Sequence, residues 1–264
     1  MNNSSLINLL NNRSIKFLFK IFEDEAKEIS LVGGCVRDSL LGREAKDIDV
    51  ASNAKPDEII NILENHKIEH KDFAYKYGSI IAIIENQKFQ ITTLREDVNQ
   101  IGRHTDIKFT NDWKIDAGRR DFTINSIYLF SDGKVLDYFG GQEDLRKNKL
   151  KFIGNIEDRI KEDFLRIYRY YRFLGIFNKP FLVENYENIL KRHFKESFIC
   201  LSNHKLREEI MKMFLTPFPL NCFYKDTGIK VKRSWIELTR KHFIEGHFDI
   251  GLNDCLNKID ILIR

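Results

Sequence analysis

The sequence predicts an α+β fold, in which an N-terminal head with a small mixed β-sheet is followed by an all-helical remainder. Up to about residue 141, short apolar runs of strand length alternate with helical patterns and glycine turns. Beyond residue 155 the apolar residues follow one long helical stripe. The chain has 264 residues, enough for one large domain or two small ones. We expect a head over residues 1–141, a helical neck over 142–200 and a shortened helical body over 201–264.

Each head element is predicted from a local pattern. Ile15, Leu18 and Phe22 recur at near-helical spacing, and an apolar strand then runs into the Gly33-Gly34 turn. Pro56 suits the first turn of a helix because its φ is already fixed there. Residues 96–116 are polar and irregular, which predicts a mobile loop. In chain order, the predicted elements are helix 14–27, strand 29–32, helix 35–41, strand 47–51, helix 56–64 and a hairpin of strands 78–84 and 88–94.

The remainder of the chain is predicted to be helical. Further helices are expected over residues 182–194 and 201–214, and the sequence contains no internal repeat. One long helix is predicted from the apolar residues Ile156, Ile160, Phe164, Ile167, Tyr170, Tyr171 and Leu174.

Composition excludes several classes of protein. Hydrophobic residues make up 42% and charged residues 31%, which is ordinary for a globular protein and argues against a disordered chain. No stretch approaches the roughly 18 apolar residues of a membrane-spanning helix. The first residues lack a secretory pattern, although residues 2–22 carry three basic side chains and no acid, as an organelle presequence does. Four widely spaced cysteines without a CxxC motif argue against a zinc knuckle and favour a reducing, cytoplasmic compartment.

Charge is unevenly distributed along the chain, whose net charge is +4. Residues 1–141 contain 19 Lys and Arg against 22 Asp and Glu, whereas residues 142–264 contain 24 against 17. An acidic half joined to a basic half suits a metal-dependent site beside a surface that binds a polyanion. Charge alone favours the alternative, a solvated surface with a chance imbalance.

The most specific motif joins a glycine turn to a pair of aspartates. Gly33 and Gly34 follow a predicted strand, so the backbone there could approach a phosphate closely, and the next helix offers free N–H groups. Asp47 and Asp49 lie two apart on a predicted strand and project to one face. Adjacent carboxylates repel unless a cation lies between them, and Mg²⁺ is a natural filler. An isolated DxD or Gly-Gly is more often a plain turn, but the whole arrangement, with Arg37 and Asp38 between, is far more specific.

At these residues the sequence resembles the class II tRNA nucleotidyltransferases, or CCA-adding enzymes, and the related bacterial poly(A) polymerases. The resemblance covers about residues 30–215 and implies a polymerase-β-like nucleotidyltransferase head that uses Mg²⁺, takes CTP and ATP, and acts on the 3′ end of tRNA. Its motifs are GGCVRDSLLG followed by DID, the segment 119–125 (RRDFTIN), the segment 137–145 (DYFGGQEDL), Gly154-Asn155 with 162–166 (EDFLR), and 169–173.

The RRD segment could bind a nucleotide. Arg119 and Arg120 supply cations for a triphosphate, and Asp121 supplies a carboxylate for a ribose hydroxyl. Asn125 could donate to a phosphate or a sugar. Taken alone, a helix cap with surface arginines explains this segment better. The resemblance implies ribose and phosphate recognition.

A second candidate group lies in the neck. On the predicted long helix, Asp163 and Arg166 share a face at i, i+3 spacing. The carboxylate could accept from the exocyclic amine of cytosine or adenine, and the guanidinium could donate to ring acceptors. A surface ion pair is the alternative. The resemblance implies that these two side chains act as a protein template for the incoming nucleotide. Arg169 and Arg172 follow at the same spacing and could face phosphates or pack through their stems.

Three features depart from the family pattern. Gln90 stands where the family usually carries a glutamate, so a third carboxylate is missing from that strand. Residues 202–205 read SNHK where SxER is common, and lysine lacks the bidentate fork of arginine. Family members are also usually much longer, and residues 216–264 do not match their helical body.

The predicted function is template-independent addition of C and/or A residues from CTP and ATP to the 3′ end of tRNA, with release of pyrophosphate. The alternatives are a poly(A) polymerase of the same family, an enzyme that adds only CC or only A, and a catalytically weakened RNA-binding homologue. Asp47 and Asp49 are the predicted catalytic residues and Mg²⁺ ligands. The predicted nucleotide-binding residues are Gly33, Gly34, Arg37, Arg119, Asp121, Asn125, Asp163, Arg166 and Arg169.

Overall fold

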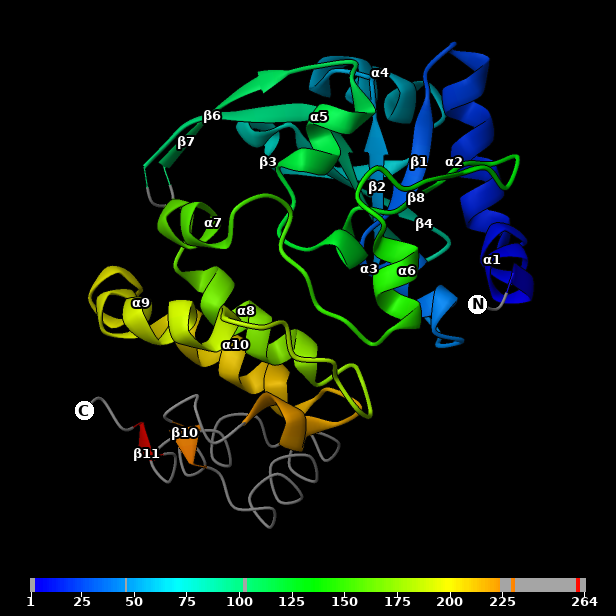
Figure 1. Cartoon of the computed structure of the whole chain (residues 1–264). Coiled ribbons are helices and arrows are strands. Elements are labelled where there is room, and N and C mark those ends of the chain that lie inside the picture. The colour runs from blue at the N-terminus through cyan, green and yellow to red at the C-terminus, as the bar shows by residue number, and fades with distance from the viewer. Residues whose placement is uncertain (1–2, 46, 102–103, 224–228, 231–259, 262–264) are drawn as a thin grey trace. The chain divides into compact units, whose positions relative to one another are not determined.

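The computed structural model describes residues 3–45, 47–101, 104–223, 229–230 and 260–261, and the chain divides into two compact units (Figure 1). The first unit comprises Met1–Lys147 with Lys151–Ile153, and the second comprises Asn148–Leu150 with Gly154–Arg264. The domain boundaries expected after residues 141 and 200 stay predictions. No helix of the described residues is both long enough and apolar enough to cross a membrane.

A seven-stranded mixed sheet forms the centre of the first unit, with strand order β3-β4-β5-β2-β1-β8-β9. Only the pair β2–β5 is parallel, and all other neighbours are antiparallel. This architecture confirms the predicted α+β head with a small mixed sheet. The strands are β1 (Ile29–Val32), β2 (Ile48–Ser52), β3 (Glu69–Ala74), β4 (Ser79–Ile84), β5 (Gln87–Thr93), β8 (Tyr128–Leu129) and β9 (Val135–Leu136).

Helices cover this sheet with the apolar faces that the sequence pattern predicts. α2 buries Ile15, Leu18 and Phe22, and the Asn12 side chain caps its start by accepting from the Ile15 N–H at 3.0 Å. α4 begins at Pro56 and packs on β3, β4 and β5. The helices of this unit are α1 (Asn3–Leu10), α2 (Arg13–Asp24), α3 (Gly34–Leu40), α4 (Pro56–Asn65), α5 (Trp113–Gly118) and α6 (Gly141–Arg146), with 3₁₀ turns η1 (Tyr75–Tyr77) and η2 (Thr123–Asn125).

The prediction of a mobile loop over residues 96–116 is wrong. Instead β6 (Arg95–Ile101) and β7 (His104–Phe109) form an antiparallel two-stranded sheet, and α5 follows. Glu96 lies opposite Lys108, so a cross-strand pair of opposite charges supports the ladder. Only residues 106–109 alternate between polar and apolar side chains, so the sequence signal for this sheet is short.

The second unit contains α7 (Ile156–Glu162), α8 (Leu165–Leu174), α9 (Tyr186–Cys200), α10 (Asn203–Phe214) and the 3₁₀ turn η3 (Pro219–Cys222). The single helix expected through residues 156–174 is broken after Glu162. Asp163 adopts an extended conformation, with φ −152° and ψ 105°, and its carboxylate accepts from the Leu165 N–H at 3.0 Å. The aspartate therefore ends one helix and caps the next. The described residues also include a short strand pair, β10 (Ile229–Lys230) and β11 (Asp260–Ile261), which an all-helical remainder does not anticipate.

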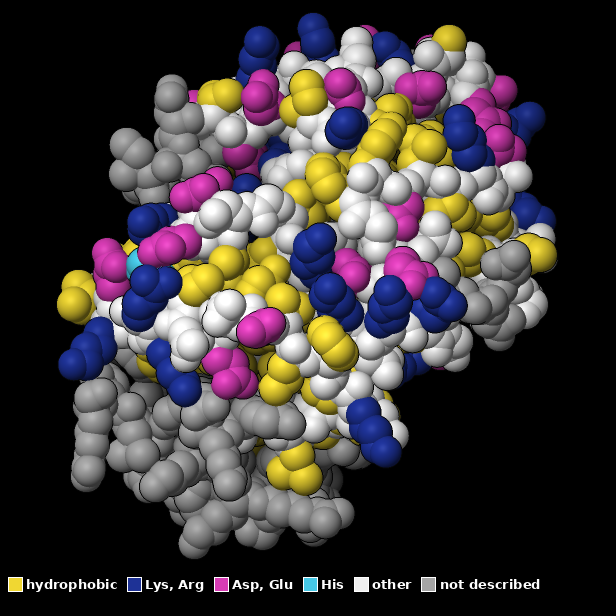
Figure 2. Space-filling view, viewed as in Figure 1, with side chains coloured by type: hydrophobic (Ala, Val, Ile, Leu, Met, Phe, Trp, Pro, Cys, Tyr) yellow, Lys and Arg dark blue, Asp and Glu magenta, His cyan; other side chains and the backbone are white. Residues whose placement is uncertain are grey.

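The surface carries charges of both signs side by side. In Figure 2, basic and acidic side chains are interspersed over the described part of the visible face. Several form close surface pairs, such as Glu143 with Arg146 at 2.6 Å. On this face the mixed charges are typical of an ordinary solvated surface, which is the alternative given above to a surface that binds a polyanion.

Candidate active site

The Gly33 turn lies against one of the two predicted catalytic aspartates. Gly33 has φ +75°, a conformation that glycine adopts without strain, and it joins β1 to α3. A Cβ at this position would lie 3.5 Å from Asp49 Oδ2 and 3.8 Å from a terminal guanidinium nitrogen of Arg120. Gly34 begins α3, and a Cβ there would lie 3.7 Å from Arg37 Nη2. The turn thus leaves Asp49 and Arg120 next to bare backbone.

The strand predicted to begin at Asp47 begins one residue later, at Ile48 of β2. Asp47 precedes the strand and is exposed, whereas Asp49 is half-buried within it. The parallel register pairs Asp49 with Gln90 of β5, and Gln90 is exposed. Paired residues of neighbouring strands point to the same face. Gln90 therefore stands beside Asp49 with a neutral amide where a third carboxylate would otherwise lie.

Cys35 lies behind the turn and is unsuited to nucleophilic chemistry. Its thiol donates to the backbone oxygens of Val32 and Asp49, at 3.3 Å and 3.6 Å. Burial, reinforced by the charge of Asp49, raises its pKa to about 12. A thiol with such a pKa stays protonated at neutral pH, so Cys35 is a core residue of this site.

Three predicted nucleotide-binding side chains form one buried hydrogen-bond network. Arg37 donates through Nη1 to Asn125 Oδ1 at 2.7 Å, and Asn125 Nδ2 donates to Asp121 Oδ1 at 3.0 Å. Arg37 also makes a bidentate contact with Asp38, with both distances 2.9 Å. The three side chains of the network are all less than a tenth exposed. The network joins α3 to η2 across 88 residues of chain and holds this edge of the site rigid.

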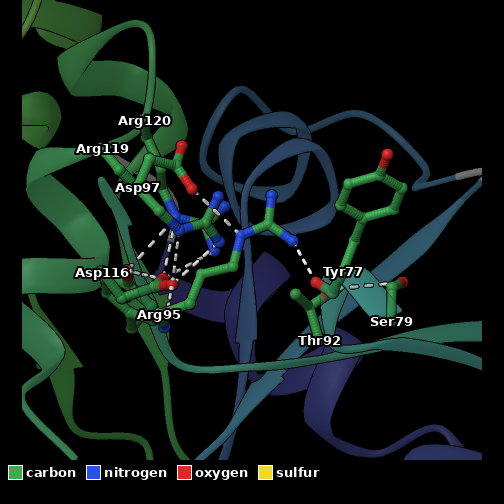
Figure 3. Close-up of polar contacts among 9 residues, drawn as sticks. Tyr77, Ser79, Thr92, Arg95, Asp97, Asp116, Arg119 and Arg120 are labelled. Atoms are coloured by element: carbon green, nitrogen blue, oxygen red, sulfur yellow. Dashed lines mark hydrogen bonds and ion pairs between the residues drawn. The ribbon is translucent and has the colours of Figure 1, made fainter. Parts of the chain in front are cut away.

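Asp116 holds the two arginines of the RRD segment (Figure 3). This buried carboxylate contacts Arg119 at 2.8 Å and Arg120 at 3.1 Å, and it accepts from the Tyr128 hydroxyl at 2.7 Å. It also accepts from the backbone N–H of Arg95, the first residue of β6, at 3.2 Å. Burial alone would favour the neutral acid, but the two guanidiniums outweigh it and hold the pKa of Asp116 well below its usual range. We call these residues the Asp116 cluster.

Asp116 was not among the predicted site residues. Its spacing of three and four residues to Arg119 and Arg120 on a short helix is a signal that could have found it. Arg120, for which the sequence predicts only a general cationic role, lies beside the Gly33 turn. Burial acts against the charge on Arg120, yet Asp116 and Tyr128 raise its guanidinium pKa, so it stays charged.

The 137–145 motif contributes no group to the site itself but positions α6 next to the η2 turn. Both carboxylate oxygens of Asp137 cap α6 by accepting from the N–H groups of Gly141 and Gln142, at 2.8 Å and 2.9 Å. A Cβ at Gly141 would lie 2.2 Å from the Thr123 carbonyl oxygen, so only glycine fits there. Asp144 accepts from the Thr123 hydroxyl at 2.7 Å. This motif therefore fixes α6 against the η2 turn.

The second unit pairs its candidate residues differently from the prediction. Arg166 is buried and contacts Glu162, and it donates to the Arg159 carbonyl oxygen at 2.8 Å. Because the helix breaks at Asp163, Asp163 and Arg166 do not share a face of one helix as expected. Arg169 lies over the Phe173 ring, with its guanidinium 5.4 Å from the centroid. This is a cation–π contact of the charged head, and the phosphate-binding role expected for Arg169 stays a prediction.

Comparison with known proteins agrees with this geometry. Residues 29–151 match the family described as the Poly A polymerase head domain. The chain is 45% identical to the human mitochondrial CCA tRNA nucleotidyltransferase 1 over 168 residues, which cover 63% of this chain and 39% of the relative. It is 33% identical to the CCA-adding enzyme of Bacillus subtilis over 194 residues, or 73% of this chain and 48% of the relative.

Among solved structures, the Bacillus stearothermophilus CCA-adding enzyme in complex with CTP matches with a TM-score of 0.71 at 26% identity. That match covers 80% of this chain and 50% of the other. The resemblance predicted from the sequence motifs is confirmed. The chain spans about two fifths to half of the length of the curated relatives it matches.

Proposed function

Because residues 29–151 match the Poly A polymerase head domain family, we propose that this protein is a template-independent RNA nucleotidyltransferase. It adds C and/or A residues from CTP and ATP to the 3′ end of tRNA. The observation that carries the proposal is the Gly33 turn, which leaves bare backbone between the carboxylate of Asp49 and the guanidinium of Arg120. A nucleoside triphosphate needs this combination of an open turn, a cation and a metal-binding carboxylate.

The donor set fits Mg²⁺ bound together with a substrate. Among the described residues, no group of three or more His, Cys, Asp or Glu side chains could hold a metal ion. Asp49 lies within β2 with the neutral oxygen of Gln90 beside it, and Asp47 lies two residues earlier, just before the strand. Mg²⁺ in nucleotide enzymes is held by one or two carboxylates and completes its shell with substrate phosphates and water. Asp47 and Asp49 would hold it, and it would neutralise charge on the triphosphate.

In the proposed reaction, the terminal 3′-hydroxyl of the RNA attacks the α-phosphorus of the bound CTP or ATP. The new O–P bond forms as the bond to the β-phosphate oxygen breaks, pyrophosphate leaves, and the hydroxyl proton passes to water. Arg119 and Arg120 would contact the phosphates, and Asp121 the ribose. The Asp116 cluster supports this assignment because it orients both guanidiniums before the substrate arrives.

Base selection is assigned to Asp163 and Arg166. Asp163 would accept from the exocyclic amine of cytosine or adenine, and Arg166 would donate to a ring acceptor. Uracil and guanine present the opposite pattern at these positions. The contact between Arg166 and Glu162 adds a requirement, because the guanidinium must keep this partner while it donates to the base.

Three alternatives make different predictions for the product. A poly(A) polymerase would add a run of A residues, a specialised enzyme would add only CC or only A, and a weakened homologue would bind RNA without extending it. Residues 74–79 (AYKYGS) lack the basic Gly-Arg-Arg/Lys-Phe type of segment that the polymerases tend to carry, which favours the tRNA enzyme. Gln90 beside Asp49 favours weakened catalysis.

A reducing compartment is also part of the proposal. Cys35, Cys200 and Cys222 are free, and none of these described cysteines forms a disulfide. Two of them are buried as thiols, and burial raises the pKa of Cys222 to about 12. Unoxidised core thiols suit a reducing compartment.

One experiment separates these alternatives. The purified chain is incubated with Mg²⁺ and a tRNA that ends at its discriminator base, with CTP alone, ATP alone or both, and the 3′ ends are sequenced. CCA ends in the presence of both nucleotides support the proposal. CC ends, single A additions or A runs identify the specialised enzymes or the polymerase. Unextended tRNA at every enzyme concentration contradicts catalysis, provided that the chain remains folded.

A further inference from the structure

Three exposed aromatic side chains follow one another at alternate positions on an edge of the head. Phe73 on β3 is 88% exposed, and Tyr75 and Tyr77 of η1 are 40% and 44% exposed. Lys71 precedes them and Lys76 lies between the two tyrosines, and both lysines are also exposed. We call residues 71–77 the aromatic strip. It lies within the first unit but takes no part in the network or cluster described above, apart from its Tyr77 carbonyl.

The register of the sheet relates this strip to the catalytic aspartates. Lys71 pairs with Ile81, Ile81 with Gln90, and Gln90 with Asp49. These four residues form one row across β3, β4, β5 and β2, and paired residues share a face of the sheet. Lys71 therefore stands on the face that carries Asp49, three strands away, or roughly 14 Å at the usual strand spacing.

A bulge turns the aromatic strip outward. The pairing of β3 with β4 shifts between Lys71 and Ala74, so Asp72 and Phe73 fall in an irregular stretch of the ladder. Natural edge strands usually carry charges and avoid exposed apolar side chains, because such edges otherwise aggregate. The charges of Glu69, Lys71 and Asp72 follow this rule, whereas Phe73 breaks it. Phe73 on the edge strand, followed by two exposed rings in the adjoining 3₁₀ turn, thus indicates a surface kept for a ligand.

Contacts with neighbouring elements hold the strip in place. The Tyr75 hydroxyl donates to Asp57 of α4 at 2.6 Å, which fixes its ring. The Tyr77 carbonyl accepts from the guanidinium of Arg95, and the Arg95 N–H donates to Asp116 (Figure 3). Hydrogen bonds through Arg95 therefore join the strip to the cluster that holds the candidate nucleotide-binding arginines.

We propose that the aromatic strip is a stacking surface for the unpaired nucleotides that precede the 3′ end of the RNA substrate. Base faces stack on aromatic rings without regard to sequence, and lysines beside the rings contact the phosphates between the bases. A growing 3′ end changes its sequence at each addition, so a sequence-tolerant surface suits it. The inference rests on the proposed function, because it names the part of the RNA that the head would hold.

Binding of a fluorescein-labelled, unstructured C- and A-containing RNA oligonucleotide tests the proposal. Fluorescence anisotropy with the full chain gives Kd for the wild type, Phe73→Ala, Phe73→Trp and Phe17→Ala. We expect Phe73→Ala to raise Kd by roughly five- to a hundred-fold, and Phe73→Trp to preserve binding, because stacking needs a ring. Phe17 is the matched control, since it is 40% exposed on α2 of the same unit. Lys71→Ala should lower the salt dependence of binding by about one phosphate contact.

Several outcomes would overturn the proposal. They are an unchanged Kd for Phe73→Ala, an equal loss for Phe17→Ala, the absence of any RNA binding by the wild type, and a wild-type dimer that Phe73→Ala dissociates in sedimentation. Failure of the proposed function looks different. If Asp49→Asn and the wild type both bind the oligonucleotide through Phe73 but neither extends tRNA, the stacking proposal is supported and the proposed activity is contradicted. If the wild type extends tRNA and the Phe73→Ala variant has the same KM for tRNA as the wild type, the proposed activity is supported and the stacking proposal is contradicted.

Discussion

Replacing Asp116 by asparagine removes one charge from the centre of the Asp116 cluster. The carboxylate is 1% exposed, and it contacts the guanidiniums of Arg119 and Arg120 at 2.8 Å and 3.1 Å. Asparagine keeps one oxygen and the shape of the side chain but removes the negative charge that Arg119 and Arg120 share. Tyr128 would also face an amide in place of a carboxylate. We expect both the stability of the head and the binding of nucleotides to suffer.

The magnitude follows from burial. Breaking a buried ion pair by removing one partner costs about 3–5 kcal/mol, which corresponds to a loss of roughly 10 °C in melting temperature for a protein of this size. Glu143 provides the matched control, because it also contacts two cations, Arg146 at 2.6 Å and Lys147 at 3.0 Å, on the surface of α6. Hydrogen bonds from those two residues lower its pKa to about 2, yet solvent screens the pairs. Glu143→Gln should leave the melting temperature unchanged within error.

Differential scanning calorimetry of the wild type, Asp116→Asn and Glu143→Gln measures the effect across pH. The pKa of Asp116 is depressed in the folded state, so its contribution is complete above the unfolded value of about 3.9 and is lost as the pH falls through the folded value. The gap between wild type and Asp116→Asn should be widest near neutral pH and narrow below about pH 4. Asp116→Asn should also raise KM for CTP and ATP more than it lowers kcat. Equal melting temperatures for the two variants would refute the reasoning.

The remaining predictions concern catalysis and nucleotide choice. Asp47→Ala or Asp49→Ala should abolish addition without destabilising the head, and near wild-type turnover in Mg²⁺ would refute the metal assignment. Gln90→Glu should raise activity or lower the Mg²⁺ concentration required, whereas an unchanged or reduced rate across a metal titration would mean that the site is adapted to two aspartates. Deleting residues 99–108 should spare CC addition and impair the final A, and equal loss of both would identify a general structural role. Asp163→Ala should lower CTP and ATP use and narrow their advantage over UTP by roughly ten- to a hundred-fold, measured as kcat/KM ratios.

The sequence predicted those elements whose apolar residues face one continuous core. β1, the Gly33 turn, α3 and β2 follow in the expected order because each is specified by a few adjacent residues. The β4–β5 hairpin was predicted for the same reason, and its register confirms it. The β6–β7 sheet was missed because its strands are specified by pairing with each other and alternate in apolar character only over residues 106–109. Local patterns cannot report such pairing.

The site was predictable in its residue types but not in its connections. Arg37 and Asn125 are 88 positions apart and belong to separate motifs, so nothing in their spacing shows that one donates to the other. Likewise, Asp49 and Gln90 become neighbours only through the parallel register of two strands that are distant in sequence. Motifs identify which side chains are present. The sheet topology then decides which of them meet.

The break at Asp163 changes how nucleotide selection must work. On one continuous helix, Asp163 and Arg166 would present a ready pair, and each would neutralise the other before a base arrived. In the structure Asp163 caps α8, while Arg166 is held by Glu162 and by the Arg159 carbonyl. The Arg166 guanidinium is thus positioned by Glu162 and the Arg159 carbonyl and not by the carboxylate of Asp163. The guanidinium keeps its contacts with Glu162 and the Arg159 carbonyl when the Asp163 carboxylate is removed, so Asp163→Ala should chiefly remove the acceptor for the exocyclic amine. Discrimination against UTP should then weaken while rejection of GTP persists. Loss of both would show that the two side chains act as one unit.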